Sequence, residues 1–531
     1  MVTTRGRQDC RASQSPAPSH QMTFRLFIAS ALLYLLYQPS PGVAAQPAAR
    51  PNVVIFITDD ESWMERSIYG WSVIPTPNFD RVARDGVLFT RGFTSAPSCA
   101  PSRAALLTGR NFWELEQGAF IQAWLPAKFP AMPELMEAGG YRAGYTGKGW
   151  GPGVVPPESG RKRNPAGNVY NSIKRPMRQP GINDIDYPAN FAKFLDERER
   201  GQPFWFWVGS TEPHAPHGTE NYKKLAEKHQ VPESAVKVPG FLPDLPGVRR
   251  HRANMLYEVC EADVDLGRVL RILEDRGELA NTLLIVTADN GTEVLRSKTN
   301  LYDWGVRVPL AMMWPARVKP QRRVDDFVNF SDLAPTILEA TSLPVPREMS
   351  GRSVLDVLLS DQAGRVDPAR SWTVAGIEWH GEAEPTNLAG RMIRDARYLY
   401  IVNYSAAPRR RLAPSAKRLP DSEYTRTAAT ADEIELIDRH PEHPAVKKFV
   451  TLFASPRPRE ELYDSEADPW QLNNIADSPA HAAVKARLKA QLEAYQRQTR
   501  DPRITGDMKI FDETRAFVNQ RKYGAGGYGE K

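Results

Sequence analysis

A cysteine and an arginine stand close together at the start of a predicted helix. The string Cys99-Ala-Pro-Ser-Arg103-Ala-Ala-Leu-Leu-Thr108 has a proline near its start and Gly109 after its end, which predicts a helix over 102–108. The N–H groups and positive potential at a helix N-terminus favour a bound anion, and Arg103 lies in the first turn. Cys99 is therefore a candidate nucleophile beside an anion site. A cysteine taken alone would favour buried packing next to a helix cap instead.

Acidic side chains follow two continuous apolar runs. Residues 52–58 end at Asp59-Asp60, and the run 282–287 is followed, after one alanine, by Asp289-Asn290. Such runs suit buried parallel strands, and ligands bind at the carboxyl edge of open α/β sheets. An all-oxygen set suits a hard cation, most simply Ca²⁺, whereas no cluster of His or Cys offers a zinc or copper site. Asp59-Asp60 alone would equally cap a helix or line a solvated turn.

Strands and helices alternate as far as about residue 365. This order predicts an α/β domain over 46–365, with a mostly parallel central sheet covered on both faces. The pattern then changes and predicts a smaller α+β domain over 366–500 with an antiparallel sheet and a C-terminal helix. Residues 406–445 have the composition of a long surface insertion, and 501–531 are predicted to be a tail. The expected elements are strands at 52–58, 87–90, 141–146, 204–209, 282–287, 372–375, 397–402 and 461–463 and helices at 253–273 and 482–496.

The composition is that of a globular protein. Of 531 residues, 41% are hydrophobic and 25% are charged, which excludes a disordered chain. The net charge of +6 is unevenly placed, because residues 1–45 hold four Arg against one Asp and the remainder is nearly balanced. Nucleic-acid binding is therefore not expected.

The first 45 residues are predicted to be a signal peptide. If Met22 is the initiator and 1–21 an over-called start, one basic residue precedes the apolar run 26–37, and small residues at 43–45 suit cleavage. We expect export to a periplasmic, secreted or lysosome-like compartment, with no stable membrane span; an uncleaved anchor is the alternative. The mature chain then keeps Cys99 and Cys260. Their contexts differ too much to suggest a disulfide, and Cys260 is predicted to pack in a helix.

The string from Cys99 to Arg110 resembles the signature of the type I sulfatases. In that family a maturation enzyme oxidises the cysteine to formylglycine, and the hydrated aldehyde is the nucleophile. The resemblance covers nearly the whole mature chain and implies an alkaline-phosphatase-like fold for the large domain. The other family blocks match in the same order, as Asp59-Asp60, Gly147-Lys148, Pro213-His-Ala-Pro216, Asp289-Asn-Gly291 and Lys298.

Within that family the chain is most similar to the sulfamidases, the heparan N-sulfatases. The similarity implies a sulfated glycan as substrate, most simply N-sulfoglucosamine at the end of a heparan-type chain, and a homodimer would be unsurprising. It is carried by Lys298-Thr-Asn-Leu-Tyr302, Asp332-Leu-Ala-Pro-Thr-Ile-Leu338, Gly376-Ile-Glu-Trp-His-Gly-Glu382 and Glu461-Leu-Tyr-Asp464 through Asp468-Pro469.

The resemblance also assigns roles to residues. A sulfate or sulfamate group is anionic, so a bound cation together with Arg103, Lys148 and Lys298 would offset the charge that the nucleophile approaches. His214 would protonate the leaving group or hydrogen-bond the sulfuryl oxygens. The hydrated aldehyde at position 99 would attack sulfur, and the alcohol or amine would leave. The implied metal ligands are Asp59, Asp60, Cys99, Asp289 and Asn290.

One block departs from the family pattern. Sulfatases often carry Lys-x-His where this chain reads Lys148-Gly-Trp150, so Trp150 replaces a histidine and is predicted to stack on a sugar ring instead. His217 is a candidate for the missing role, with a surface position as the alternative. Glu378 and His380 are candidates to recognise a sugar amine or hydroxyl, or are ordinary polar residues of the second domain.

Three other functions compete with the sulfamidase hypothesis. An O-sulfatase acting on another sulfated glycan is the strongest, because the signature does not fix the pocket loops that set specificity. Phosphonate or phosphodiester hydrolases share the cysteine and the metal pair, but many keep additional metal-binding histidines that are not placed for that role here. A catalytically dead glycan-binding relative is disfavoured by the intact Cys99, Arg103, Asp289 and Lys298.

Overall fold

The computed structural model describes residues 50–380, 387–406 and 442–520. These described residues form one compact unit. The predicted signal peptide, most of the predicted insertion at 406–445 and the glycine-rich end of the predicted tail lie outside the described residues. Among the described residues, no helix is both long and apolar enough to cross a membrane.

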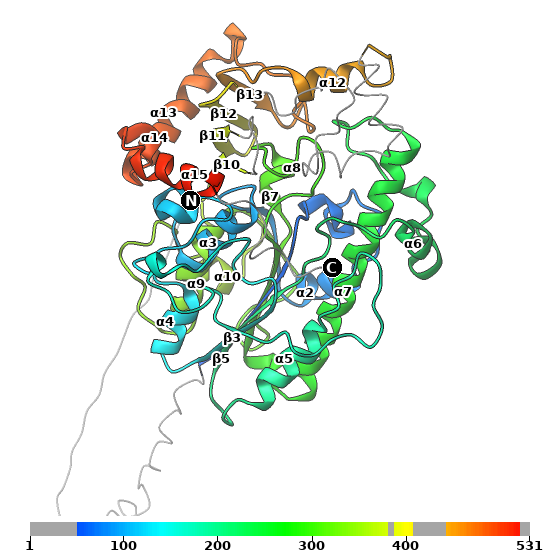
Figure 1. Cartoon of the computed structure of the whole chain (residues 1–531), viewed down its shortest axis with the longest axis vertical. Helices are drawn as coiled ribbons and strands as arrows, with labels where there is room; N and C mark the ends of the chain where they lie inside the picture. The colour runs from blue at the N-terminus through cyan, green and yellow to red at the C-terminus, as the bar shows by residue number, and fades with distance from the viewer. Residues whose placement is uncertain (1–49, 381–386, 407–441, 521–531) are drawn as a thin grey trace, which may run out of the picture. The chain divides into compact units, whose positions relative to one another are not determined.

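A nine-stranded, mostly parallel sheet forms the centre of the larger part (Figure 1). Its strands run in the order β4-β3-β5-β1-β6-β8-β2-β7, and β9 pairs with β2. Neighbours from β4 to β6 are parallel, whereas β8 is antiparallel to both β6 and β2. The strands are β1 (Asn52–Thr58), β2 (Val87–Phe93), β3 (Arg142–Gly147), β4 (Asn168–Val169), β5 (Phe204–Gly209), β6 (Thr282–Ala288), β7 (Arg307–Val308), β8 (Leu310–Met313) and β9 (Arg322–Asn329).

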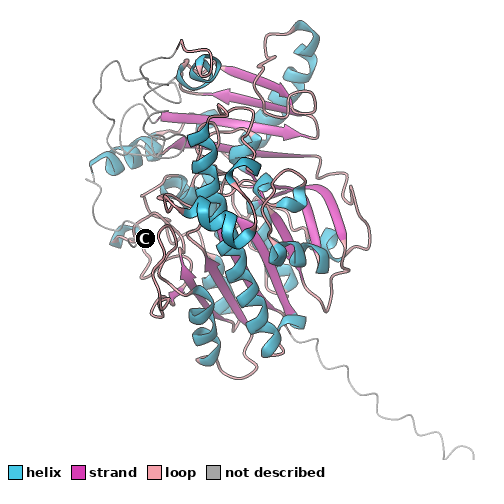
Figure 2. Cartoon of the chain, turned by 90° about the vertical axis from the view of Figure 1, so that its right-hand side faces the viewer, coloured by secondary structure: helices cyan, strands magenta, loops and turns pink. Residues whose placement is uncertain are grey.

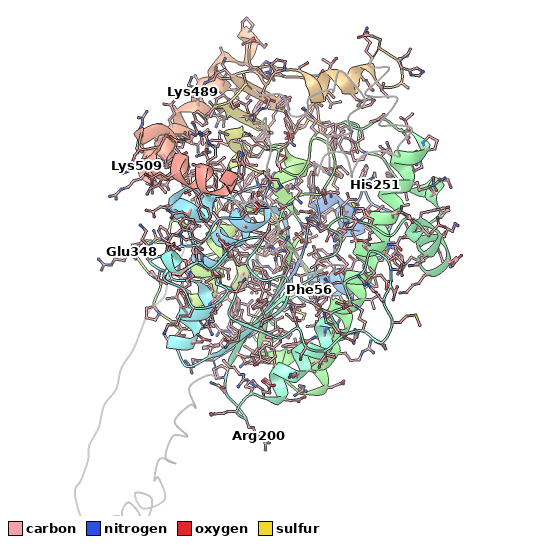
Figure 3. All side chains as sticks on the ribbon, in the orientation of Figure 1. Phe56, Arg200, His251, Glu348, Lys489 and Lys509 are labelled. Carbon is pink, nitrogen blue, oxygen red and sulfur yellow. The ribbon has the colours of Figure 1, made fainter. Side chains whose placement is uncertain are left out.

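The apolar run of β1 is buried on both faces of this sheet, as predicted. Val53, Ile55 and Ile57 belong to one hydrophobic cluster, and Val54 and Phe56 belong to another on the opposite face. Figure 3 shows Phe56 deep within the molecule. The first face is covered by α3 (Cys99–Thr108), α4 (Met132–Ala138), α9 (Leu333–Ala340) and α10 (Leu355–Leu359), and the second by α2 (Pro77–Asp85), α5 (Tyr187–Asp196) and α7 (Pro246–Asp275).

Shorter helices connect these layers. The remaining α-helices of this part are α6 (Asn221–His229) and α8 (Asp303–Val306). The 3₁₀ helices of the described chain are η1 (Trp63–Glu65), η2 (Ser67–Tyr69), η3 (Phe112–Ala119), η4 (Pro157–Ser159), η5 (Glu233–Ala235), η6 (Leu279–Asn281), η7 (Phe330–Asp332) and η8 (Pro479–His481).

A second, four-stranded antiparallel sheet follows, separate from the central sheet in Figure 2. Its order β10-β11-β12-β13 confirms the predicted antiparallel character. The elements of this part are β10 (Trp372–Trp379), β11 (Asn387–Asp395), β12 (Tyr398–Asn403), α12 (Lys447–Ala454), β13 (Glu460–Asp464), α13 (Ala482–Gln498), α14 (Pro502–Thr505) and α15 (Lys509–Gln520).

Three predicted boundaries need correction. The nucleophile helix begins at Cys99 rather than at 102, because Ser98 is the extended N-cap. Helix α7 begins at Pro246 rather than at 253, since proline fits the first helical turn. Residues 501–520 are not a loose tail: they form α14 and α15, and Phe511 packs in the same hydrophobic cluster as Phe120. An aromatic contact between such distant segments cannot be predicted from composition alone.

Candidate active site

The carboxyl ends of four adjacent strands bring the predicted residues together. In the register of the central sheet, Thr58 of β1 lies beside Ala288 of β6, and Gly147 of β3 lies beside Gly209 of β5. Asp59, Asp289 and Lys148 each follow one of these strand ends. The sequence prediction that the acidic pairs meet at one sheet edge is therefore confirmed, and Lys148 joins them there.

Three carboxylates and three cations form one buried cluster. The Lys148 ammonium donates to both oxygens of Asp59 at 2.8 and 2.6 Å. The Lys298 ammonium donates to Asp60 at 2.7 Å, and the Arg103 Nε donates to Asp289 at 2.8 Å. All six residues, which are Asp59, Asp60, Arg103, Lys148, Asp289 and Lys298, are buried. Each carboxylate of the cluster is therefore paired with a cation inside the protein.

Cys99 is the first residue of α3 and faces this cluster. Its Sγ lies 3.7 Å from Oδ1 of Asp59, and the side chain is fully buried. Burial raises the pKa of the thiol well above its ordinary value, despite the nearby Lys148 and Lys298. The unmodified cysteine is therefore a protonated thiol at neutral pH and a poor nucleophile.

Arg103 connects three strand ends. Its Nη1 donates to the carbonyls of Lys148 and Gly149 at 2.9 and 3.1 Å, while Nε bonds to Asp289. Nη2 lies 3.5 Å from Asp59 and makes no hydrogen bond to any described residue. This buried donor is left over for a further acceptor. The strand ends of β3 and β5 also lie so close together that position 147 requires glycine. The φ of Gly147 is +72°, and a Cβ there would meet the Gly209 carbonyl oxygen at 1.9 Å.

The pKa values of the clustered side chains shift in different directions. Burial raises the pKa of Asp59, but Lys148 and the other cations outweigh it, so that the pKa ends well below the ordinary value. Burial and the Asp59 charge raise the pKa of Asp289 to about 7. The pKa of Lys148 is raised even though burial opposes this, because Asp59 stabilises the ammonium. Asp59 and Lys148 are thus a charged pair at neutral pH.

His214 lies at the other side of the cluster. Its Nδ1 is 2.6 Å from the Ala215 carbonyl, to which it must donate, and its Nε2 is 3.2 Å from the Lys298 ammonium. Burial and the Lys298 charge lower the pKa of His214 to about 4. Neutral His214 therefore accepts from Lys298 through Nε2. The predicted role as proton donor would require a proton to be supplied to that nitrogen first.

The donor set fits a hard cation. Ligand atoms of Asp59, Asp60 and Cys99 lie within 4.8 Å of one another, as do those of Asp60, His214 and Glu293. Asn290 donates through Nδ2 to Asp60 at 2.7 Å, whereas its buried Oδ1 has no hydrogen-bond partner among the described residues. A buried amide oxygen without a donor is costly, and a cation held by these oxygens would satisfy it.

The sequence prediction for Trp150 needs correction. The indole is only 2% exposed and its Nε1 donates to the carbonyl of Ala100 at 3.1 Å, beside the nucleophile. It therefore has no free face on which a sugar could stack. The alternative of a surface position for His217 is also wrong: its side chain is 4% exposed and its Nδ1 lies 3.1 Å from the Glu258 carboxylate.

The two candidates from the second domain, Glu378 and His380, lie in different surroundings. Glu378 is 3% exposed and pairs with Arg391 and Arg503, so it is placed as a structural ion-pair partner rather than as a sugar ligand. His380 lies against the nucleophile loop, with Nδ1 2.8 Å from the Ser98 Oγ. Sequence reasoning missed Ser98 and Glu293, although both lie within three residues of a predicted site residue.

Comparisons with known proteins agree with this geometry. Residues 51–343 match the family model "Sulfatase", and residues 293–409 match "N-sulphoglucosamine sulphohydrolase, C-terminal". The chain is 28% identical over 503 residues to human N-sulphoglucosamine sulphohydrolase, covering 88% of this chain and 94% of the relative.

Solved structures share the fold. One, described as a complex with its substrate D-glucosamine-2-N,6-O-disulfate, superposes with a TM-score of 0.62 at 19% identity and covers 85% of this chain and 98% of its own. The phosphonate monoester hydrolase of Agrobacterium radiobacter superposes with a TM-score of 0.58 at 20% identity and covers 85% and 96%. At such identities the likeness concerns the fold alone. With the family model spanning more than half of its length, the chain belongs to the sulfatase family and is a hydrolase of sulfate esters or sulfamates.

Proposed function

We propose that this protein removes sulfate from sulfated glycans and acts on N-sulfoglucosamine residues of heparan-type chains. The observation that carries the proposal is the buried cluster at Cys99, in which Arg103 Nη2 and Asn290 Oδ1 make no hydrogen bond to the described residues. The similarity to human N-sulphoglucosamine sulphohydrolase supports the choice of the N-sulfated sugar. The protein is exported, as residues 1–45 predict.

The chain's own side chains provide the charge that the reaction needs. Lys148 and Lys298 lie beside Asp59 and Asp60, respectively, and Arg103 presents Nη2 toward Asp59. A sulfuryl group that enters this buried cluster exchanges water for fixed donors, which stabilise developing negative charge without reorganisation. Neutral His214 accepts from Lys298 and so orients its ammonium.

Two groups complete the site. Asp59, Asp60, Asp289 and Asn290 would hold one divalent cation, most simply Ca²⁺, which supplies further positive charge for the sulfuryl oxygens when bound. Formylglycine in place of Cys99 supplies, as its hydrate, a hydroxyl nucleophile that the buried thiol cannot match.

The test is sulfate release by protein co-expressed with a formylglycine-generating enzyme. N-sulfoglucosamine and 6-O-sulfated N-acetylglucosamine are compared, Cys99→Ala is the control, and peptide mass confirms conversion at position 99. Release from the N-sulfated sugar alone, abolished in the control, is the expected result. Release from the O-sulfated sugar alone contradicts the N-specificity and leaves an O-sulfatase. No release from either by converted protein rejects the proposed substrate class and directs the assay to phosphonate and phosphodiester substrates.

A further inference from the structure

The loop that precedes the nucleophile is held by the second sheet. The backbone N–H of Gly376 on β10 donates to the carbonyl of Ser95 at 3.0 Å. Ser95 also donates through its hydroxyl to Asn329, whose amide donates to the carbonyl of Val374 at 2.9 Å. His380, directly after β10, reaches the Ser98 Oγ at 2.8 Å. Residues 95–98 are thus tied to β10 at both ends.

Ser98 is in the position of a helix cap but does not act as one. It is the N-cap residue of α3, and its side chain makes no capping hydrogen bond. An N-cap serine ordinarily accepts from the backbone N–H two or three residues on. Here Pro101, three residues on, has no N–H, and the Ser98 side chain does not accept from Ala100 either. The hydroxyl is instead directed to His380. The Ser98 side chain therefore bonds to His380 and does not cap the helix.

This pair and the nucleophile share one buried environment. Ser98 and Cys99 are both 0% exposed, and His380 is 2% exposed. A buried hydroxyl that loses its partner is costly, so the hydrogen bond holds Ser98 in one orientation. Because Ser98 and Cys99 are joined by one peptide bond, the orientation of Ser98 sets the direction in which residue 99 enters the charged cluster.

We propose that His380 is a positioning residue for the nucleophile: it acts from the second sheet, through Ser98, to hold position 99 in its reactive direction. This role replaces the sugar-recognition role that the sequence suggested for His380. The inference rests on the proposed function only in the use of formylglycine at position 99; it does not depend on which sulfated sugar is the substrate.

His380→Ala should lower kcat by about tenfold to hundredfold, because a displacement of about 1 Å of a reacting group costs up to about 10² in rate. KM should change by less than about threefold, since the substrate's own contacts remain. His380→Asn should recover most of kcat, because an amide can reach Ser98 from nearly the place of Nδ1. A rise in KM at unchanged kcat would overturn the proposal and restore sugar recognition.

Two controls separate positioning from folding. His481 and Ser478 form a second His–Ser pair, with Nδ1 3.1 Å from Oγ, on η8 in the second domain. His481→Ala should leave kcat unchanged. Ser98→Ala should match His380→Ala, and the double variant should lose no more than either single one, because both remove the same interaction. Additive losses, or an equal loss in the His481 variant, would contradict the proposal.

A readout without turnover completes the test. Folded protein with formylglycine at position 99 is treated with an aminooxy probe, and labelling of the peptide that contains residue 99 is followed by mass. Labelling should be slow in the wild-type protein and in His481→Ala, and several-fold faster in His380→Ala at temperatures where each variant is folded. Equal labelling rates would overturn the positioning role. If converted wild-type protein releases no sulfate at all, the proposed function fails, while the labelling comparison still decides the role of His380.

Discussion

Two buried charge clusters of this molecule look alike by composition and differ in what they leave unpaired. At the sheet edge, three carboxylates meet Arg103, Lys148 and Lys298. In the second domain, Arg391 pairs with Glu378 and Asp501. Arg503 pairs with Glu378, so each cluster has as many basic as acidic side chains, and both central guanidinium groups are fully buried. Charge balance and burial therefore do not distinguish an active site from a structural ion pair.

Hydrogen-bond completeness does distinguish them. Every nitrogen of Arg391 has an acceptor: Nε and Nη2 bond to Asp501, Nη2 also bonds to Glu378, and Nη1 bonds to the carbonyls of Ile377 and Gly390. The guanidinium also lies 5.0 Å from the Trp113 ring centre. At the sheet edge, by contrast, Arg103 Nη2 has no hydrogen-bond partner in the described chain. Of these two clusters, the one at the sheet edge therefore keeps a donor for a further acceptor, whereas the Arg391 cluster does not.

The largest effect is expected from breaking the structural cluster. Arg391→Met should lower the free energy of unfolding by about 3–5 kcal/mol, because it leaves Asp501 as a buried carboxylate without its main partner. Urea unfolding measures this. The kcat of the molecules that remain folded should stay within about twofold of wild type, since Arg391 touches no residue of the sheet-edge cluster. A large loss of kcat at unchanged stability would contradict the division of roles.

Breaking the sheet-edge cluster should have the opposite signature. Arg103→Lys keeps the charge but loses the forked donors to Asp289 and to the Lys148 and Gly149 carbonyls. We expect kcat to fall by about 10²–10³, as for the removal of one transition-state donor. Peptide mass must first show equal formylglycine content at position 99. Activity within tenfold of wild type would mean that the reserved Nη2 serves no ligand.

The sequence could predict the sheet edge but not the contacts across domains. Continuous apolar runs identify β1 and β6, and parallel strands then place Asp59 and Asp289 at the same edge of the sheet. That β1 and β6 are neighbours is known only from the structure. Ser98 and His380 are separated by 282 residues, and no periodicity records such a contact. Composition also cannot tell that Trp150 is buried against Ala100. Chemistry carried by strand ends is therefore readable, whereas chemistry carried by packing between domains is not.

Metal binding should distinguish the two clusters further, because only the sheet-edge cluster is expected to bind Ca²⁺. At a Ca²⁺ concentration of 100 times its Kd, the free energy of unfolding should rise by about 2.7 kcal/mol through mass action, and a chelator should reverse this. Asp60→Asn should abolish the response, because Asp60 belongs to both candidate ligand groups. Arg391→Met should keep the response on its lower baseline. A Ca²⁺ response that survives Asp60→Asn would place the ion elsewhere in the molecule.

The smallest effect on the free energy of unfolding is expected from a partly exposed carboxylate. Glu460 on β13 accepts from the Tyr400 hydroxyl at 2.6 Å, from Lys489 at 3.0 Å and from Lys485 at 3.4 Å. The Tyr400 hydrogen bond together with the two lysines lowers the pKa of Glu460 to about 2. A folded-state pKa below the unfolded value means that the stabilisation is present above about pH 4.3 and is lost as the pH falls toward 2.

Glu460→Gln should therefore cost no more than about 1 kcal/mol at pH 7, because solvent screens a partly exposed pair. The difference from wild type in urea unfolding should shrink as the pH is lowered from 5 to 2.5. A cost at pH 7 as large as that of Arg391→Met, or one that does not change with pH, would show that burial is not what separates surface ion pairs from the two internal clusters. The contrast between the clusters would then have to be explained by packing around their carbon atoms rather than by charge.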